Sequence, residues 1–387
     1  MTQTVYINQI SAFMPLDPVS NDEMEQRLGQ VGARPSRARK LILRSNGIKQ
    51  RHYVIDPATG KPRYTNAQLT AEAIRGLQDE YFSLEQIECL TAGTSLPDQI
   101  APNHAVMVQG ELGNPPCEVV ATSGICLCGI TALKYAWMAV ATGQAATAVA
   151  AGSEVASNLM HAGNFNDEYE HRLSELEKQP EIAFEKDFLR WMLSDGAGAV
   201  LLQDKPRQTG ISLRVDWIDV LSFADRMPAC MFAGAEQQED GSLKGWMRHT
   251  PEQRTQQSVM VLKQNVKLLN ENIVRLTVEE ALKRILQKRP LVAEDIDYFL
   301  PHYSSEYFRD RLKDGLDKAG LPIPQSRWFT NLVQKGNTGS ASIFIMLEEL
   351  FNSGRLQPEQ KLLCYIPESG RFSSAFMHLT VTNHAAG

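Results

Sequence analysis

The sequence predicts an α/β protein built from two similar halves that stack in layers. Residues 126–143 are apolar around the whole circumference of a predicted helix, and residues 146–154 have the apolar pattern of a buried strand. In the second half, the glycine-flanked turn at 336–340 opens another apolar helix, much as 124–126 opens the first. Two βαβ-rich units, each with a buried central helix, predict a layered architecture.

The elements expected along the chain alternate between strands and helices in both halves. Strands are expected at 5–13, 119–122, 146–154, 194–202, 211–222, 296–300, 360–366 and 375–382, and at the end of 84–94. Helices are expected at 22–31, 36–43, 67–79, 105–112, 126–143, 256–288, 305–319 and 341–352. The polar segments 155–190 and 225–252 are expected to leave the core. We predict two units, 1–205 and 206–387, that share one interface.

Composition narrows the class of protein. The 387 residues are 43% hydrophobic and 22% charged, as in ordinary globular proteins, and the net charge of −6 gives no indication of nucleic-acid binding. The six cysteines lack the spacing of a disulfide framework, which favours a reducing, cytoplasmic setting. We see no signal peptide and no stretch of about 18 apolar residues, so no membrane span is expected. No metal or cofactor is expected either.

Cys126 is a candidate nucleophile because a predicted strand ends and a predicted helix begins beside it. The start of a helix presents unpaired N–H groups and partial positive charge. This field is expected to lower the pKa of the thiol and to favour the reactive thiolate. Cysteines inside apolar helices are also common as small core residues, so both interpretations stand for this residue alone.

His302 and Asn337 are candidate partners from the second half. His302 follows an apolar strand and a proline, and Asn337 lies in a turn flanked by glycines. Alone, the first is also typical of a structural histidine, and the second of an asparagine that tolerates left-handed backbone. Together with Cys126 they form a nucleophile and two donors that can polarise one thioester carbonyl.

Glu154 is a candidate for an additional acid or base. It ends the predicted buried strand, where an unpaired carboxylate is costly and its pKa is expected to rise. The alternative is a carboxylate in an ion pair or at an interface.

Four segments resemble the ketoacyl-synthase III family of the thiolase superfamily. They are residues 103–152, LSDGAGAVLL (193–202), FLPHYSS (299–305) and GNTGSASI (336–343), in the family's order. The resemblance covers nearly the whole chain and implies the thiolase fold, with five alternating layers of helices and sheets. It implies a condensing enzyme that uses acyl thioesters, and a homodimer.

The resemblance also assigns roles to the candidate residues. Cys126 would be acylated, and its spacing to the glycines at 129, 143 and 152 favours it over Cys128, the alternative nucleophile. His302 and Asn337 would stabilise the enolate or the thioester oxygen. A malonyl-type partner would lose CO2, whereas a β-ketoacyl partner would require a base to remove a proton.

One departure from the family pattern concerns the thioester carrier. Residues 45–53 resemble the segment that holds pantetheine, but the expected tryptophan is absent, and the resemblance places Leu41 at its position. This favours acyl carrier protein over free coenzyme A. An acidic carrier protein is expected to contact basic side chains. The candidates, which a solvated helix face explains equally well, are Arg37, Arg39, Lys40, Arg44, Arg309, Arg311 and Lys313.

The added material at 155–190 and 225–252 suggests a specialised, secondary-metabolic substrate. The chain looks most like the ketosynthases that build dialkylresorcinols and bacterial stilbenes, which join two β-ketoacyl-type units and close a cyclohexanedione ring. Two alternatives remain: an acyltransferase that passes the acyl group to a hydroxyl or amine, and a non-catalytic partner subunit. The presence of both His302 and Asn337 favours condensation, because a carbanion needs both donors.

Overall fold

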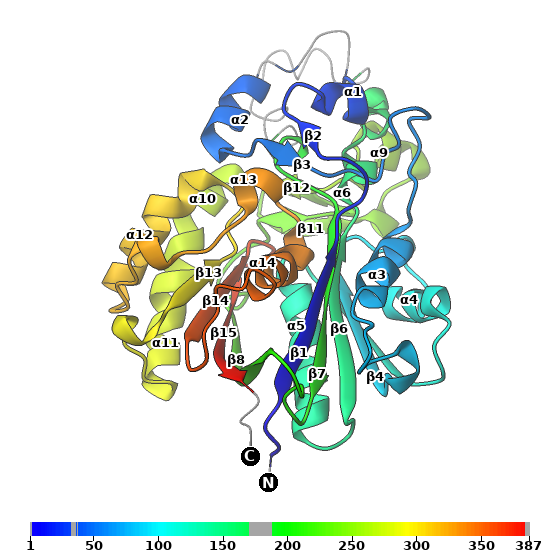
Figure 1. The fold of residues 1–387 in the computed structure, drawn as a ribbon. Coiled ribbons are helices and arrows are strands. Elements are labelled where there is room, and N and C mark those ends of the chain that lie inside the picture. The colour runs from blue at the N-terminus through cyan, green and yellow to red at the C-terminus, as the bar shows by residue number, and fades with distance from the viewer. Residues whose placement is uncertain (1, 32–35, 37, 170–187, 384–387) are drawn as a thin grey trace.

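The structure is a computed structural model that describes residues 2–31, 36, 38–169 and 188–383 (Figure 1). Nine strands form one mixed sheet in the order β13-β14-β15-β8-β1-β7-β6-β4-β5. Their bounds are β1 Tyr6–Phe13, β4 Cys89–Thr94, β5 Glu118–Ser123, β6 Thr147–Glu154, β7 Gly196–Gln203, β8 Ile211–Ser222, β13 Tyr298–Pro301, β14 Lys361–Glu368 and β15 Ser373–Asn383.

The two halves of the sheet repeat the same pairing pattern. In the first half β4 is parallel to β6, β6 is antiparallel to β7, and β7 is antiparallel to β1. In the second half β13 is parallel to β14, β14 is antiparallel to β15, and β15 is antiparallel to β8. The halves meet where Tyr6 and Ile7 of β1 pair with Arg214 and Leu213 of β8. The predicted pair of similar α/β halves is therefore confirmed.

Helices lie on both sides of each half-sheet and between them. The central helices are α5 (Leu127–Ala141) and α14 (Ser342–Phe351), which share one hydrophobic core with residues of β6, β7, β14 and β15. Helices α3 (Asn66–Arg75) and α4 (His104–Leu112) cover the outer face of the first half, and α10 (Val266–Val274), α11 (Ala281–Lys288) and α12 (Arg309–Lys318) cover that of the second (Figure 1). The order of layers is α-β-α-β-α, as predicted.

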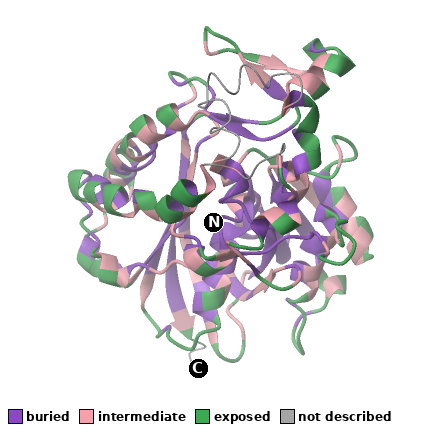
Figure 2. Ribbon diagram, turned by 90° about the horizontal axis from the view of Figure 1, so that it is seen from above, coloured by how far each residue is buried: buried purple, intermediate pink, exposed green. Residues whose placement is uncertain are grey.

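Glycines allow the central elements of the two halves to approach closely. A Cβ on Gly129 of α5 would lie 2.2 Å from the carbonyl oxygen of Ser340, and one on Gly152 of β6 would lie 2.5 Å from the same atom. Neither position accepts a larger residue without backbone movement. Figure 2 shows the result, with buried residues concentrated in the strands and central helices and exposed residues on the outer helices.

The short elements complete the chain. The remaining short strands are β2 Val19–Ser20, β3 Gln50–Arg51, β9 Met231–Phe232, β10 Ala235–Gln237, β11 Leu243–Gly245 and β12 Lys263–Gln264. The remaining α-helices are α1 Met24–Leu28, α2 Arg39–Asn46, α6 Ala156–Met160, α9 Pro251–Gln256 and α13 Leu332–Lys335. Single 3₁₀ turns occur at Leu84–Gln86, Ala162–Asn164, Trp246–Arg248, Ala293–Asp295, Glu306–Phe308, Gln325–Arg327 and Gly339–Ala341. Within the described ranges, no helix has both the length and the apolar character that a bilayer span requires.

The prediction of one long helix over 256–288 was wrong. The chain leaves the helical path after α9, with Ser258 at a φ of +47°, and β12 pairs with β9 before the next helix begins. Asn265 then caps α10 by accepting the N–H of Leu268, and a π-helical turn, Arg275–Glu280, joins α10 to α11. The segment 225–252 was expected to be a polar loop, but it contains β9 and the β10–β11 hairpin.

The proposed boundary between the two units lies in the connection between β7 and β8. The side chain of Asn8 holds this connection by donating to the carbonyl of Lys205 and accepting the N–H of Arg207. The division into 1–205 and 206–387 stays a prediction. Part of the predicted excursion at 155–190, residues 170–187, lies outside the described residues.

Candidate active site

Cys126 lies immediately before α5 and lines two adjoining cavities. We name them after one further lining residue each. The Asn337 cavity is lined by Ser95, Leu96, Ile125, Cys126, Glu154, Ala156, Leu189, Met192, Leu193, Ser194, Met231, Leu262, Gln264, Ser304, Asn337, Gly339 and Ser369. The His302 cavity is lined by Cys126, Leu269, Ile273, Val274, His302, Tyr303, Ser304, Phe308, Leu312, Tyr365, Pro367 and Ser369.

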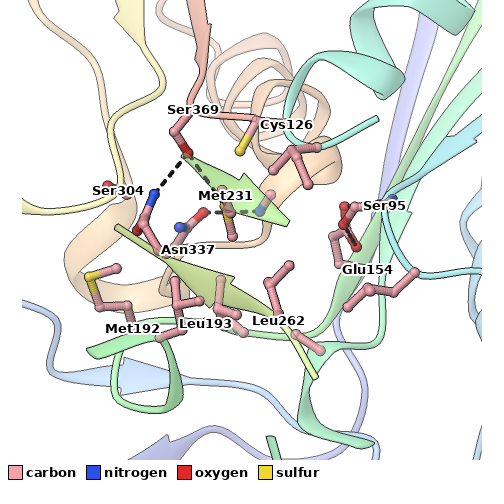
Figure 3. Close-up of a pocket in the computed structure, with 17 residues that line it drawn as sticks. Ser95, Cys126, Glu154, Met192, Leu193, Met231, Leu262, Ser304, Asn337 and Ser369 are labelled. Carbon is pink, nitrogen blue, oxygen red and sulfur yellow. Dashed lines mark hydrogen bonds between the residues drawn. The ribbon is translucent and has the colours of Figure 1, made fainter. Parts of the chain in front are cut away.

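The predicted catalytic residues therefore line two adjoining cavities that share Cys126. Asn337 and Glu154 share the first cavity with Cys126, as Figure 3 shows, and His302 shares the second. Cys126, Ser304 and Ser369 line both cavities.

The two cysteines differ in access. Cys128 is buried, lines neither cavity, and donates its S–H to the carbonyl of Ile125 at 2.8 Å. Cys126 is partly exposed to the cavities. A nucleophile has to reach its substrate, so this difference favours Cys126.

His302 is held as a neutral imidazole. Its backbone N–H donates to the carbonyl of Tyr365 at 2.8 Å, which fixes the residue beside β14. Burial disfavours the charged form and lowers the pKa of His302 to about 4. A neutral imidazole keeps one nitrogen as a donor and one as an acceptor, so it can donate to a carbonyl oxygen or receive a proton.

Asn337 is fixed by its own backbone and by the turn that follows it. Its carbonyl accepts the N–H of Ser194 at 2.8 Å, and its N–H donates to the carbonyl of Met192 at 3.1 Å. The side-chain oxygen accepts the N–H of Gly339 at 3.0 Å. Because this contact occupies the oxygen, the NH2 group remains to donate to a bound molecule.

Glu154 is hydrogen-bonded, and it forms no ion pair with another residue that the structure describes. Its Oε1 accepts the N–H groups of Ser95 and Ser340, each at 3.2 Å, and its Oε2 accepts the Ser95 hydroxyl at 2.6 Å. The expected rise in its pKa is confirmed in direction, because burial outweighs these hydrogen bonds. The contacts tie the end of β6 to the turn that carries Asn337. The acid or base role of Glu154 stays a prediction.

The expectation that the helix start lowers the pKa of Cys126 was wrong. Burial raises the pKa of this thiol, and the carboxylates of Glu368 and Glu154 raise it further. The Oε2 atom of Glu368 accepts the N–H groups of Ile125 at 2.9 Å and Leu127 at 3.1 Å. The positive end of α5 is thus already occupied by a negative group.

Several site residues were missed from the sequence. Gln264 donates to the hydroxyl of Ser369 at 2.8 Å, and this hydroxyl contacts the sulfur of Met231 at 3.4 Å, on the wall beside Cys126 (Figure 3). Met231 lies in the segment that was expected to be a loop and Gln264 in the one that was expected to be a long helix, whereas Ser369 directly follows β14. Glu368 could have been found, because β14 ends in a glutamate as β6 does.

The basic residues predicted to meet a carrier protein differ in availability. Arg44 and Arg311 are exposed, whereas Arg309 donates to Gln325 and to the hydroxyl of Tyr303. The others are as follows: Lys313 pairs with Asp317, Arg39 pairs with Glu25 at 2.6 Å, Lys40 is exposed, and Arg37 lies outside the described residues.

The described part of the chain shows no group of three or more histidine, cysteine or acidic side chains arranged to hold a metal ion. Leu41, at the position where an adenine-stacking tryptophan was expected, is 55% exposed on α2. Docking of a carrier protein therefore stays a prediction that neither observation tests.

Comparison with known proteins shows which sequences this chain is similar to. Residues 286–366 match the sequence model for the C-terminal part of 3-oxoacyl-[acyl-carrier-protein (ACP)] synthase III. A beta-ketoacyl-[acyl-carrier-protein] synthase III from Xanthomonas oryzae pv. oryzae is 24% identical over 368 residues, covering 94% of this chain and 95% of the relative. The counterpart from Xanthomonas euvesicatoria pv. vesicatoria is 25% identical over the same shares.

Solved structures show the same fold. A variant of OleA from Xanthomonas campestris, with bound lauric acid and lauroyl-CoA, matches with a TM-score of 0.71 at 18% identity, covering 98% of this chain and 100% of that one. The tetronic acid condensing enzyme AbyA1 matches with a TM-score of 0.70 at 19% identity, covering 97% and 100%. The chain therefore has the same fold as these solved structures. Its sequence is similar to ketoacyl-synthase III proteins over most of its length, and residues 286–366 match the C-terminal part of that family.

Proposed function

We propose that the protein forms a carbon–carbon bond between an acyl group held on Cys126 and a second acyl thioester. The observation that carries this proposal is the position of the Cys126 side chain, which lines one cavity with Asn337 and another with His302. Two neutral donors in the cavities that share Cys126 suit a reaction in which negative charge develops on a carbonyl oxygen. An enolate partner needs such stabilisation before it attacks.

Acyl uptake exchanges one thioester for another. The sulfur of Cys126 attacks the carbonyl carbon, the bond from that carbon to the carrier's sulfur breaks, and the thiol proton of Cys126 ends on the departing thiol. The raised pKa of Cys126 means that the resting group is a thiol, so this proton has to be removed during the attack. Neutral His302, which lines the same cavity, supports the proposal as the proton's first acceptor.

Condensation then returns the sulfur to its starting state. An enolate forms from the second thioester, either by loss of CO2 from a malonyl group or by loss of an α-proton from a β-ketoacyl group. Its carbon attacks the acyl carbon on Cys126, and the carbon–sulfur bond breaks. The sulfur leaves as a thiolate and takes up a proton. His302 and Asn337 would stabilise the enolate oxygen.

The shape of the site favours a second substrate that itself carries an acyl chain. The His302 cavity is lined by apolar side chains of α10 (Leu269 and Ile273), by Phe308 just before α12 and by Leu312 on α12. The other cavity is also mainly apolar. Two such cavities suit two chains, which supports a β-ketoacyl partner over malonyl. Closure of a cyclohexanedione ring, as in the enzymes for dialkylresorcinols and bacterial stilbenes, belongs to this proposal as its final step.

Delivery by acyl carrier protein is part of the proposal. The curated relatives carry the carrier protein in their name, and exposed Arg44 and Arg311 offer positive charge to an acidic partner. A homodimer is proposed because β5 is an edge strand, with exposed Val106 on α4 and Met138 on α5, helices that both contact it. A cytoplasmic location is proposed because the six cysteines lack the spacing of a disulfide framework.

Intact-protein mass spectrometry tests the proposal. Wild type, Cys126→Ala and Cys128→Ala are incubated with a panel of acyl thioesters on carrier protein and on coenzyme A. We expect an acyl adduct on wild type and on Cys128→Ala, and none on Cys126→Ala. An adduct that survives Cys126→Ala but is lost in Cys128→Ala would overturn the assignment of the nucleophile.

A second candidate function, acyl transfer to a hydroxyl or amine, shares the acyl-enzyme but needs no enolate. The carboxamide of Asn337, which keeps its NH2 group available beside Cys126, favours condensation over this alternative. A non-catalytic partner subunit is disfavoured because Cys126 is accessible from two cavities.

A further inference from the structure

Glu368 holds the turn that carries the nucleophile, and the condensation chemistry above gives it no role. It is the last residue of β14 in the second half of the chain. One of its oxygen atoms accepts the N–H groups of Ile125 and Leu127, at 2.9 Å and 3.1 Å. These two residues flank Cys126. A single carboxylate oxygen therefore accepts a hydrogen bond on each side of the nucleophile.

The backbone N–H of Cys126 lies between these two hydrogen-bonded N–H groups. The N–H of Cys126 has no acceptor in any other described residue, while its two neighbours are both bound to Glu368. An N–H beside a nucleophile is well placed to stabilise the oxygen of a thioester as charge develops on it. Its direction depends on the two peptide planes that Glu368 fixes.

We propose that Glu368 is a positioning residue, which clamps the amides on both sides of Cys126 so that the N–H of Cys126 stays directed at the oxygen of the incoming thioester. This inference rests on the function proposed above, since it assigns a part of the same acylation step. Glu368 lines neither cavity, so it acts through Cys126 and not on the substrate.

The carboxylate of Glu368 also affects the pKa of the Cys126 thiol. After burial itself, Glu368 is the largest cause of the raised pKa of the Cys126 thiol, followed by Glu154. The other titratable groups around this sulfur are Cys128 on α5 and His302 after β13, and neither supplies positive charge at neutral pH. Glu368 thus keeps the resting sulfur protonated while it holds the turn ready.

Two substitutions separate the effect of the hydrogen bonds that Glu368 accepts from the effect of its negative charge. In Glu368→Gln an amide oxygen can still accept both N–H groups, but the negative charge is lost. In Glu368→Ala both are lost. The surface substitution Glu85→Gln, in the exposed 3₁₀ turn at Leu84–Gln86, is the matched control. Alkylation of Cys126 by iodoacetamide is followed against pH by peptide mass spectrometry, without any acyl substrate. The rate of acyl uptake is measured separately, and circular dichroism confirms that each variant is folded.

We expect the pH midpoint of Cys126 alkylation to fall by about one unit in both Glu368 variants and to stay unchanged in Glu85→Gln. Acyl uptake should remain close to wild type in Glu368→Gln and fall at least about tenfold in Glu368→Ala. Equal acylation rates in the two variants would overturn the positioning role, and an unchanged midpoint in Glu368→Gln would overturn the electrostatic part. Because alkylation needs no thioester, a shifted midpoint without acyl uptake in wild type would refute the proposed function and leave the charge effect standing.

Discussion

In each half, a glutamate at the end of an equivalent strand accepts backbone N–H groups from a turn of the other half. The strands β6 and β14 occupy equivalent positions in the two half-sheets, and each ends in a glutamate. Glu154 of β6 accepts the N–H of Ser340, at the turn that opens α14. Glu368 of β14 accepts the N–H groups of Ile125 and Leu127, at the turn that opens α5.

The difference between the two glutamates matches the residue that each turn presents. Glu154 is fully buried and accepts three hydrogen bonds, and it steadies the turn of Asn337, the proposed donor to a substrate. Glu368 is half-buried, accepts two, and steadies the turn of Cys126, the proposed nucleophile. Each half therefore contributes hydrogen bonds that hold a turn of the other half.

The largest expected effect separates two residues that follow equivalent strands. Ser95 follows β4 and His302 follows β13, but Ser95 binds Glu154 while His302 lines a cavity with Cys126. His302→Ala should lower the rate of condensation by about 10²–10³-fold, since it removes a donor to the developing charge. Ser95→Ala, the matched control, should lower it by less than about tenfold. Product formation under saturating thioester measures both, and equal losses would contradict the comparison.

The next effect concerns the packing of Glu154 against the Asn337 turn. Gly339 has a φ of +52°, and a Cβ there would lie 2.9 Å from Cγ of Glu154. Gly354 has a φ of +72° with no atom within 4 Å of the added Cβ, so Gly354→Ala isolates the backbone cost, about 1 kcal/mol. Gly339→Ala should cost about 1–3 kcal/mol more in the free energy of unfolding. Urea unfolding of the two variants measures the difference, and equal stabilities would show that the contact is unimportant.

The smallest effect is a pH dependence of stability. The pKa of Glu154 is raised by burial, so the folded protein binds its proton more tightly than the unfolded chain does. Its contribution to stability is therefore present below the ordinary glutamate pKa and is lost as pH rises through the raised value. Glu154→Gln removes this loss and keeps an acceptor for both N–H groups. Relative to wild type, the variant should gain about 1 kcal/mol between pH 4 and pH 7.

Thermal unfolding at a series of pH values measures this gain. A stability difference between Glu154→Gln and wild type that does not change with pH would show that the carboxyl group titrates normally in the folded protein.

The sequence predicted the architecture well because its signals are local. The all-round apolar character of α5 and the buried pattern of β6 require no knowledge of distant contacts, and the repeated glycine turns show the relation between halves. The prediction of a long helix over 256–288 was wrong because the helical spacing of polar residues continues through β12. In the structure β12 pairs with β9 instead. That pairing joins residues about thirty positions apart, which helical periodicity does not report.

The sequence predicted the residues of the candidate site better than it predicted the pKa of Cys126. Cys126, His302 and Asn337 were singled out from their positions at element ends, and the structure brings all three to adjoining cavities. The pKa of Cys126 was predicted in the wrong direction because Glu368 lies 242 positions away in the chain and occupies the helix start. Only the folded arrangement reveals that contact.

The most direct test of the account uses two acyl thioesters that differ in isotopic label. The enzyme is incubated with both, and the extracted products are analysed by mass spectrometry beside Cys126→Ala and Asn337→Ala controls. The account predicts a condensed product that contains carbon from both substrates in wild type, and its loss in both variants. An enzyme that loads the acyl group on Cys126 but only hydrolyses it, or passes it to an added alcohol or amine, would contradict the account.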